Sequence, residues 1–251
     1  MSELALAVAF GLLIGLVLGT IGGGGSILTV PILVYILGMS AHQATATSLI
    51  IVGITALAGL LPHMHAGRVD VRRAVLVSLT GVPGAIVGTR LNDLVSGRLL
   101  LGLFGVLMVV VGALMATRSS QEREEEHPIS RGIVPTLATG FAIGVLTGFF
   151  GVGGGFLIVP ALTLVLGMAM PNAVGTSLLV IAINSAAAAL SHGIGSVGDP
   201  AIAILFAAGG VVGSLAGGRY GGQLKASWLQ RGFAGFTIVL GLMLAGVNLV
   251  C

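Results

Sequence analysis

The sequence carries an ungapped internal duplication over most of its length, and this repeat constrains the fold more than any single motif does. Adding 129 to a residue number carries VPIL at 30–33 onto VPAL at 159–162. The same offset relates a series of glycines, namely Gly11, Gly15 and Gly19 to Gly140, Gly144 and Gly148. We therefore expect two homologous halves, residues 1–116 and 132–251, joined by a charged linker at 117–131.

Each half contains four long apolar segments, which indicates helices that cross a lipid bilayer. Only 8% of the residues are charged and 56% are hydrophobic, whereas a soluble domain carries about 25% charged residues. The apolar runs are long and do not alternate with polar residues, which favours α-helices over a β-barrel. The net charge of +3 is then explained by cytoplasmic loops rather than by a nucleic-acid-binding surface.

A glycine cluster interrupts the first apolar segment of each half, with GGGG at 22–25 and GVGGG at 151–155. Four glycines inside one helix would weaken it by roughly 3–4 kcal/mol relative to alanine. A continuous helix over 4–38 would also reach about 52 Å, against a bilayer core of about 30 Å. We therefore predict two short helices, near 4–20 and 25–38, that enter the membrane and return to the same side.

The positive charges favour this hairpin topology. It places nine of the 11 Arg and Lys residues on one side of the membrane and leaves Arg90 and Arg98 on the other. If each first segment crossed once instead, the split would be six against five. Because positive loops face the cytoplasm, both termini are expected outside. The expected fold is an all-α integral membrane protein of two inverted-topology repeats, each with a glycine-broken helical hairpin followed by three transmembrane helices.

Inverted repeats with broken helices are typical of secondary transporters. A break exposes backbone N–H groups at the N-terminus of the following helix, and such a terminus attracts anions. We expect the two hairpin tips to meet near the midplane and hold an anion there, with tight turns or close helix contacts as the alternative role. The candidate residues are Gly22, Gly23, Gly24, Gly25, Gly151, Gly153, Gly154 and Gly155.

The motifs GTIGGGGSILTVPIL with ATATSL, and GFFGVGGGFLIVPAL with AVGTSL, resemble the duplicated signature of the TauE/SafE sulfite-exporter family. The resemblance covers nearly the whole chain. It implies transport of sulfite, organosulfonates or related sulfur-containing anions across the cytoplasmic membrane, without choosing among these anions. The halves differ within these motifs. Gly23-Gly24-Gly25-Ser26 of the first half matches Val152-Gly153-Gly154-Gly155 of the second, and Ala46 stands where the second half has Gly175. The two tips therefore need not contact the substrate equally.

Hydroxyl and amide side chains beyond each hairpin form a second group of candidates. Thr47, Ser48, Thr176 and Ser177 lie early in the next predicted helices, where a hydroxyl can donate to a substrate oxygen or bond to its own helix. Asn184 lies within an apolar segment, where an unpaired amide is costly. It is either a substrate ligand or a partner in an interhelical hydrogen bond.

Titratable residues also match between the halves. His63 and His192 are candidates for a proton or anion relay, with a membrane-interface position as the slightly favoured alternative. Arg90 and Arg219 end another matched pair of segments, where they complement the helix dipole or form a gate.

All eight Asp and Glu residues lie in loops or at segment ends, and Asp70 and Asp199 are predicted N-caps. No nucleophile-and-base set is present, so we expect no enzymatic activity, no cofactor and no metal. Without a carboxylate inside the membrane, potential-driven export of an anion is favoured over proton coupling through the histidines. Such export releases about 2.3 kcal/mol per charge per 100 mV.

The expected function is a secondary transporter, by preference an exporter, in the cell inner (cytoplasmic) membrane. Its expected partners are a small anion and the lipid bilayer, with self-association as a further option and no nucleic acid. Two other classes stay open, an anion channel on the same scaffold and a non-transporting membrane assembly factor. The anion, the direction, the coupling ion and the oligomeric state are not fixed by these residues.

The topology predicts where the linker lies. A cysteine introduced as Ser119→Cys, in a Cys251→Ser background, should resist membrane-impermeant thiol reagents in intact cells and react after permeabilisation. Labelling from outside in intact cells would contradict the inverted arrangement.

Overall fold

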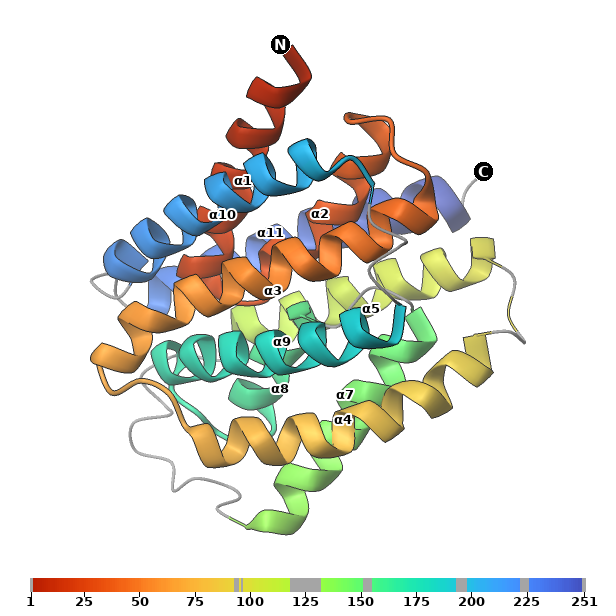
Figure 1. Ribbon diagram of the computed structural model, residues 1–251. Helices are drawn as coiled ribbons and strands as arrows, with labels where there is room; N and C mark the ends of the chain where they lie inside the picture. The colour runs from red at the N-terminus through yellow and green to blue at the C-terminus, as the bar shows by residue number, and fades with distance from the viewer. Residues whose placement is uncertain are drawn as a thin grey trace. The chain divides into compact units, whose positions relative to one another are not determined.

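The computed structural model describes residues 2–92, 95, 97–117, 132–150, 155–192, 198–221 and 226–249. Regular structure in these residues is entirely α-helical (Figure 1). The helices are α1 (Ser2–Ile21), α2 (Gly24–Tyr35), α3 (Ala41–His65), α4 (Val71–Asn92), α5 (Gly97–Thr117), α7 (Ile133–Phe150), α8 (Gly155–Leu164), α9 (Met170–His192), α10 (Pro200–Gly221) and α11 (Ala226–Leu249).

Seven of the described helices are long and apolar enough to cross a membrane, which confirms a multi-pass helical membrane protein. These are α1, α3, α4, α5, α7, α9 and α10. Helices α2 and α8 are apolar but shorter, with 12 and 10 residues. They are the second arms of the two glycine-interrupted segments.

The first arm in the first half is longer than the predicted 4–20, and the matched arm of the second half is of similar length. Helix α1 has 20 residues and α7 has 18, which corresponds to about 30 Å and 27 Å. The helical hydrogen bonds continue through Ile21, because the Gly22 N–H donates to the Leu18 carbonyl at 2.8 Å. Gly22 then adopts a φ of 85°, which glycine reaches without steric cost, and α2 begins at Gly24. Each interrupted segment therefore combines one helix of nearly full span with one short helix.

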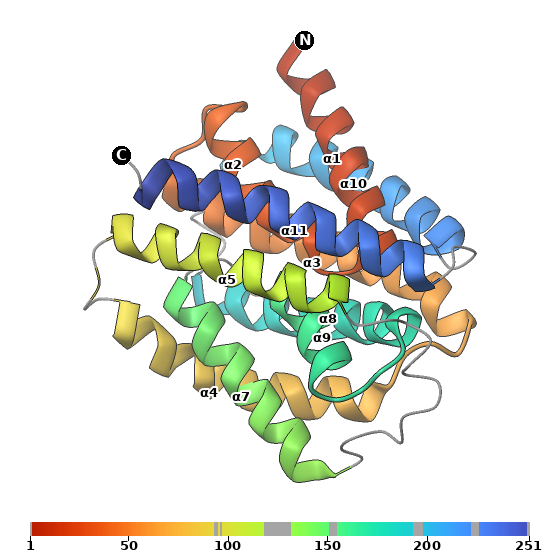
Figure 2. The same cartoon turned by 180° about the vertical axis from the view of Figure 1, so that it is seen from behind.

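The chain forms two compact units, and each unit takes helices from both halves of the duplication. The first unit comprises Met1–Val75 and Pro171–Gln223, and so contains α1, α2, α3, α9 and α10. The second comprises Leu76–Met170 and Leu224–Cys251, with most of α4 and with α5, α7, α8 and α11. In the second unit α5 and α11 lie side by side (Figure 2).

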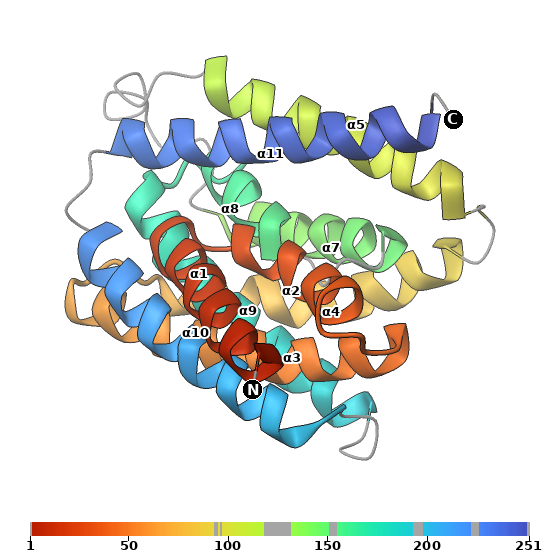
Figure 3. The same ribbon diagram turned by 90° about the horizontal axis from the view of Figure 1, so that it is seen from above.

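A glycine seam joins α1 to α10 in the first unit (Figure 3). A Cβ atom placed on Gly15 would overlap the backbone carbonyl of Gly210. Equivalent overlaps occur one turn to either side, between Gly11 and Phe206 and between Gly19 and Ser214. Residue numbers rise together along both helices, so α1 and α10 run parallel, with their backbones in direct contact.

The second unit repeats this seam between α7 and α4. A Cβ on Gly144 would overlap the carbonyl of Gly81. The flanking contacts pair Gly140 with Val77 and Gly148 with Ala85. Each of these pairs matches a pair of the first seam, with 129 added to the residue on α1 and 129 subtracted from the residue on α10. The duplication is therefore visible in the packing, and the first helix of each half packs on a helix of the other half.

The two seams differ in their polar contacts. In the second unit, the Thr80 hydroxyl donates to the Leu137 carbonyl at 2.9 Å, and the Asn92 amide donates to the Phe149 carbonyl at 2.6 Å. At the matched positions of the first unit, Gly209 and Gly221 stand instead. The seam between α1 and α10 therefore lacks the side chains that make these two bonds in the other seam.

The seams predict which glycines are essential for folding. Gly15→Ala should force α1 away from α10 and lower the free energy of unfolding by about 1–3 kcal/mol. Thermal unfolding of the purified protein in detergent measures this as a lower Tm. The matched control is Gly235→Ala in α11, where a Cβ would meet nothing within 4 Å. That substitution should leave Tm unchanged or raise it, and equal losses in both variants would contradict the seam.

Candidate functional site

The first glycine cluster forms the turn between α1 and α2, and its residues have different roles. Gly22 supplies the positive φ. Gly23 stands at the N-cap of α2, which no side chain caps. A Cβ on Gly25 would lie 2.7 Å from the Ile14 carbonyl oxygen and 3.1 Å from the Leu18 Cβ, so this glycine permits close contact of the two arms. The helix N-terminus at Gly24 thus keeps backbone N–H groups without a side-chain acceptor.

The second cluster is described only in part. Gly155 is the first residue of α8 and is buried. Gly151, Gly153 and Gly154 lie outside the described residues, and their predicted role as an anion-binding tip stays a prediction.

Helices α3 and α9 are matched by the duplication, and they pack antiparallel within the first unit. Cβ atoms placed on Gly53, Gly59 and Gly175 would lie close to Ser185, Leu178 and His63, respectively. Along these contacts the residue numbers rise on α3 while they fall on α9, so the two helices run antiparallel. Inverted repeats require this arrangement of matched helices. The inversion of the two complete halves stays a prediction.

Two matched polar residues lie near the centre of the α3–α9 crossing, the region where these two helices contact each other. The contacts above place the centre near residues 54 and 184, which is where Thr55 and Asn184 stand. The Thr55 hydroxyl and the Asn184 Oδ1 are buried and have no hydrogen-bond partner among the described residues. An unsatisfied buried polar group costs about 1–3 kcal/mol. Both groups are therefore suited to accept or donate a bond when a polar ligand is present.

Thr47 and Thr176 link the halves through reciprocal hydrogen bonds. The Thr47 hydroxyl accepts from the Gly198 N–H at 3.0 Å, and the Thr176 hydroxyl accepts from the Asp70 N–H at 3.0 Å. Both side chains are 0% exposed. Neither hydroxyl donates its own proton to a protein acceptor in the described part of the chain. Each threonine therefore retains one buried O–H donor.

Ser48 and Ser177 use their hydroxyl protons within their own helices. Ser48 donates to the Thr45 carbonyl at 2.8 Å, and Ser177 donates to the Val174 carbonyl at 2.7 Å. The two residues of each predicted Thr-Ser pair thus differ in what they can offer to a ligand. Only the threonine holds an uncommitted O–H, a distinction that residue type alone could not give.

The structure does not bring the two Thr-Ser pairs together. His63 faces Gly175, the neighbour of Thr176, whereas Thr47 precedes His63 by 16 positions on α3. At 1.5 Å per residue this separates the two threonines by about 24 Å along the helix pair. They lie toward opposite ends of the α3–α9 crossing.

His63 is buried within the first unit beside the end of α1. Its side chain is 2% exposed, and its Nε2 lies 3.1 Å from the Gly19 carbonyl oxygen, three residues before Gly22. Its Nδ1 has no partner among the described residues. The bond to Gly19 could not be predicted from the sequence, because no local pattern links residues 44 positions apart. His192 ends α9, and its side chain lies outside the described residues.

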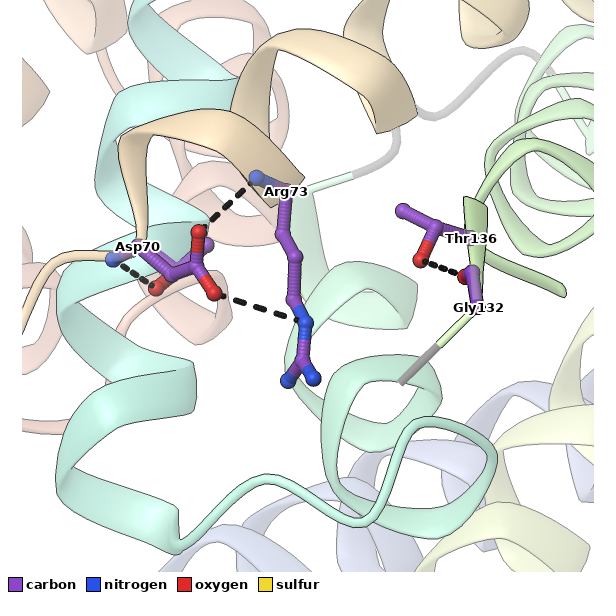
Figure 4. A network of polar contacts seen from close by, with 5 residues as sticks. Asp70, Arg73, Gly132 and Thr136 are labelled. Atoms are coloured by element: carbon purple, nitrogen blue, oxygen red, sulfur yellow. Dashed lines mark hydrogen bonds and ion pairs between the residues drawn. The ribbon is translucent and has the colours of Figure 1, made fainter. Parts of the chain in front are cut away.

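The two aspartates cap helices as predicted. The Asp70 carboxylate accepts from the Arg73 N–H at 2.9 Å and lies 3.4 Å from the Arg73 Nε (Figure 4). The Asp199 carboxylate accepts from the Ala201 N–H at 2.8 Å. Arg90 and Arg219 are exposed near the ends of α4 and α10, and a gating role for them stays a prediction.

Comparisons with known proteins identify relatives of this chain. The profile of the sulfite exporter TauE/SafE family matches residues 7–244. A probable membrane transporter protein of Xylella fastidiosa is 39% identical over 228 residues, which cover 90% of this chain and 87% of the relative. A probable membrane transporter protein of Bacillus subtilis is 27% identical over 244 residues, with 87% of each chain covered. No solved structure matches the chain.

The bond between Thr176 and Asp70 predicts a stability effect. Thr176→Val leaves the Asp70 N–H without its acceptor, which should cost about 1–3 kcal/mol and lower Tm by at least about 2 °C. Thr176→Ser keeps the hydroxyl and should restore most of the loss. Thermal unfolding in detergent compares wild type with the two variants. An unchanged Tm in the valine variant would show that the bond does not stabilise the segment between α3 and α4.

Proposed function

The chain belongs to the sulfite exporter TauE/SafE family, and from this premise we propose that this membrane transporter is a secondary carrier in the cell inner membrane. Its proposed substrate is sulfite, an organosulfonate or a related small sulfur-containing anion, and its proposed direction is export. The proposal includes no enzymatic step and no cofactor. Relatives that are 39% and 27% identical carry the name probable membrane transporter protein.

The uncommitted hydroxyl protons of Thr47 and Thr176 are the observation that carries the proposal. Each hydroxyl already accepts an N–H bond from the other half. A hydroxyl that accepts one hydrogen bond becomes a stronger donor for the next, especially where the surroundings are of low dielectric. A small oxyanion offers several acceptor oxygens to such donors.

The uncapped N-terminus of α2 adds a second source of positive potential. Helix N-termini carry roughly half a positive charge, and their free N–H groups bind anions. The first cluster begins three residues after Gly19, whose carbonyl lies against His63 at the Thr176 end of the α3–α9 crossing. Dipoles and neutral donors would contact the anion directly there.

The separation of the two threonines gives the carrier two half-sites rather than one. We assign one half-site to the Thr176 end and one to the Thr47 end, about 24 Å apart along the helices. Thr55 and Asn184 supply unsatisfied polar groups near the centre of the crossing. An anion that moves between the ends would meet these groups, which suits alternating access to the two membrane faces.

A binding and flux measurement tests the proposal. Purified protein is screened by thermal shift against sulfite, thiosulfate, sulfate and methanesulfonate, and flux is then measured in proteoliposomes. We expect a rise in Tm with at least one sulfur oxyanion and a saturable flux of the same anion. Unitary current steps would assign a channel instead. Absence of both binding and flux would contradict a transport function.

Variants of the Thr-Ser pairs locate the site. Thr47→Val and Thr176→Val should each lower the saturable sulfite flux by about tenfold or more, since a hydrogen bond to a charged group contributes about 1.5–3 kcal/mol. Ser48→Ala and Ser177→Ala are the matched controls, because these hydroxyls already donate to their own helices. The controls should stay within about twofold of wild type. Equal losses in threonine and serine variants would remove the threonine hydroxyls from the site.

A further inference from the structure

His63 has a defined tautomer and an unused lone pair. The Gly19 carbonyl can only accept, so the Nε2 that lies 3.1 Å from it carries the hydrogen. In a neutral ring the Nδ1 is then a bare acceptor. That atom is buried and has no partner among the described residues. A proton is the smallest ligand that satisfies it, and it requires no cavity.

The charged groups around His63 determine when it can hold a proton. Helix α1 contributes the Gly19 carbonyl and α9 contributes Gly175. Helix α9 has no Asp, Glu, Lys or Arg residue. Helix α1 has one, Glu3, which lies at the end of the helix far from Gly19. On α10, Gly218 packs against Pro62, and the next residue is Arg219.

The segment after α3 adds Arg68, whose charge acts on the imidazole, and then Asp70, whose carboxylate is engaged by Arg73. His65, also on α3, is exposed. Among the described residues near His63, the charges without an ion-pair partner, those of Arg68 and Arg219, are therefore positive. They oppose a proton on His63 while the site is empty, and an arriving anion removes that opposition. Proton and anion thus favour each other's binding, which is the thermodynamic basis of coupling.

We propose that the Nδ1 of His63 is the proton site through which this carrier couples anion movement to proton movement in the same direction. The inference rests on the proposed transport function. One proton adds to the Nδ1 lone pair and gives an imidazolium, while the Nε2–H bond to Gly19 persists and becomes charge-assisted. The same proton leaves from Nδ1 after the anion is released, so the ring returns to its starting state. Each cycle moves one proton with one anion. For a monovalent anion this is electroneutral, so the direction of transport follows the combined concentration gradients of the anion and the proton rather than the membrane potential, and export requires a higher anion concentration inside.

The bond to Gly19 links this proton to the glycine break. Gly19 belongs to the last turn of α1, three residues before the positive-φ Gly22. A charge-assisted hydrogen bond is roughly twice as strong as a neutral one. Protonation therefore tightens the hold of α3 on the end of α1, next to the N-terminus of α2. The sequence favoured uncoupled export, because it shows no carboxylate inside the membrane and both histidines lie near a helix end rather than at the tips. The contact of His63 with Gly19 favours coupling instead, because it places this histidine beside the first glycine break.

Two glutamine variants separate a proton role from a structural one. In His63→Gln the amide nitrogen reaches the place of Nε2 and can donate to Gly19, but the side chain does not titrate. His65→Gln is the matched control, since His65 lies two residues away on the same helix and is exposed, with its Nδ1 2.8 Å from the Leu61 carbonyl oxygen. If His63 only anchors the end of α1, His63→Gln should behave as wild type in the uptake assay below.

The first readout is proteoliposome uptake of methanesulfonate, an anion too weakly basic to carry the proton itself, with sulfite in parallel and the potential clamped at zero. With the outside one pH unit more acidic, wild type and His65→Gln should accumulate methanesulfonate up to about tenfold, since one pH unit corresponds to about 1.4 kcal/mol. His63→Gln should equilibrate it without accumulation. Saturable flux that ignores the pH gradient in wild type would overturn the coupling and leave the transport function standing.

The second readout does not depend on flux. Imidazole-¹⁵N NMR of the wild type, assigned by comparison with His63→Gln, reports the protonation of each ring nitrogen. We expect the Nε2–H tautomer without ligand and a protonated Nδ1 when sulfite is added at mildly acidic pH. A His63 ring that stays neutral with and without sulfite over roughly pH 5–8 would overturn the proposal. If neither anion shows saturable flux, the transport function fails, and this measurement alone decides the proton site.

Discussion

Direct contact between helix backbones at the glycine seams is the interaction on which the rest of the structure depends. In lipid there is no hydrophobic gain from bringing apolar helices together, so close van der Waals packing has to drive their association. Gly15 against Gly210 and Gly144 against Gly81 allow contact that any Cβ would prevent. Each seam joins a helix of one half to a helix of the other, so each compact unit is built from helices of both halves. The end of α1, and with it the first glycine break, is thereby fixed against α10.

The two seams are matched in geometry but unequal in energy. Thr80 and Asn92 bond across the α4–α7 seam, where the α1–α10 seam has glycine at both positions. Interhelical side-chain bonds in membranes contribute about 0.6–2 kcal/mol each. The α1–α10 seam is therefore held by packing without this added contribution. It is also the seam that carries Gly19, the partner of His63, so the less strongly bonded pair of helices is the one connected to the candidate site.

The sequence predicted the features that depend on local chemistry and left out those that depend on partners. The break after Ile21 and the caps at Asp70 and Asp199 follow from conformational cost and spacing, and the structure has them. The spacing of Gly11, Gly15 and Gly19 is typical of close helix packing, but it does not indicate which helices meet, because a small residue specifies contact without specifying its partner. The same limit applies to Thr176 and His63. Their hydrogen bonds to Asp70 and Gly19 span 106 and 44 residues, and no local pattern encodes such distances.

The charge distribution of the first unit suits the proposed anion carrier, which must also release its substrate. A fixed arginine at the crossing would bind an anion strongly in a low dielectric, and it would remain a costly buried charge after release. Threonine hydroxyls, a helix N-terminus and an amide instead provide neutral donors whose cost when empty is about 1–3 kcal/mol per unsatisfied group. A histidine adds positive charge only while it is protonated. Attraction for the anion can then rise on loading and fall on release, which a permanently charged side chain at the same place could not achieve.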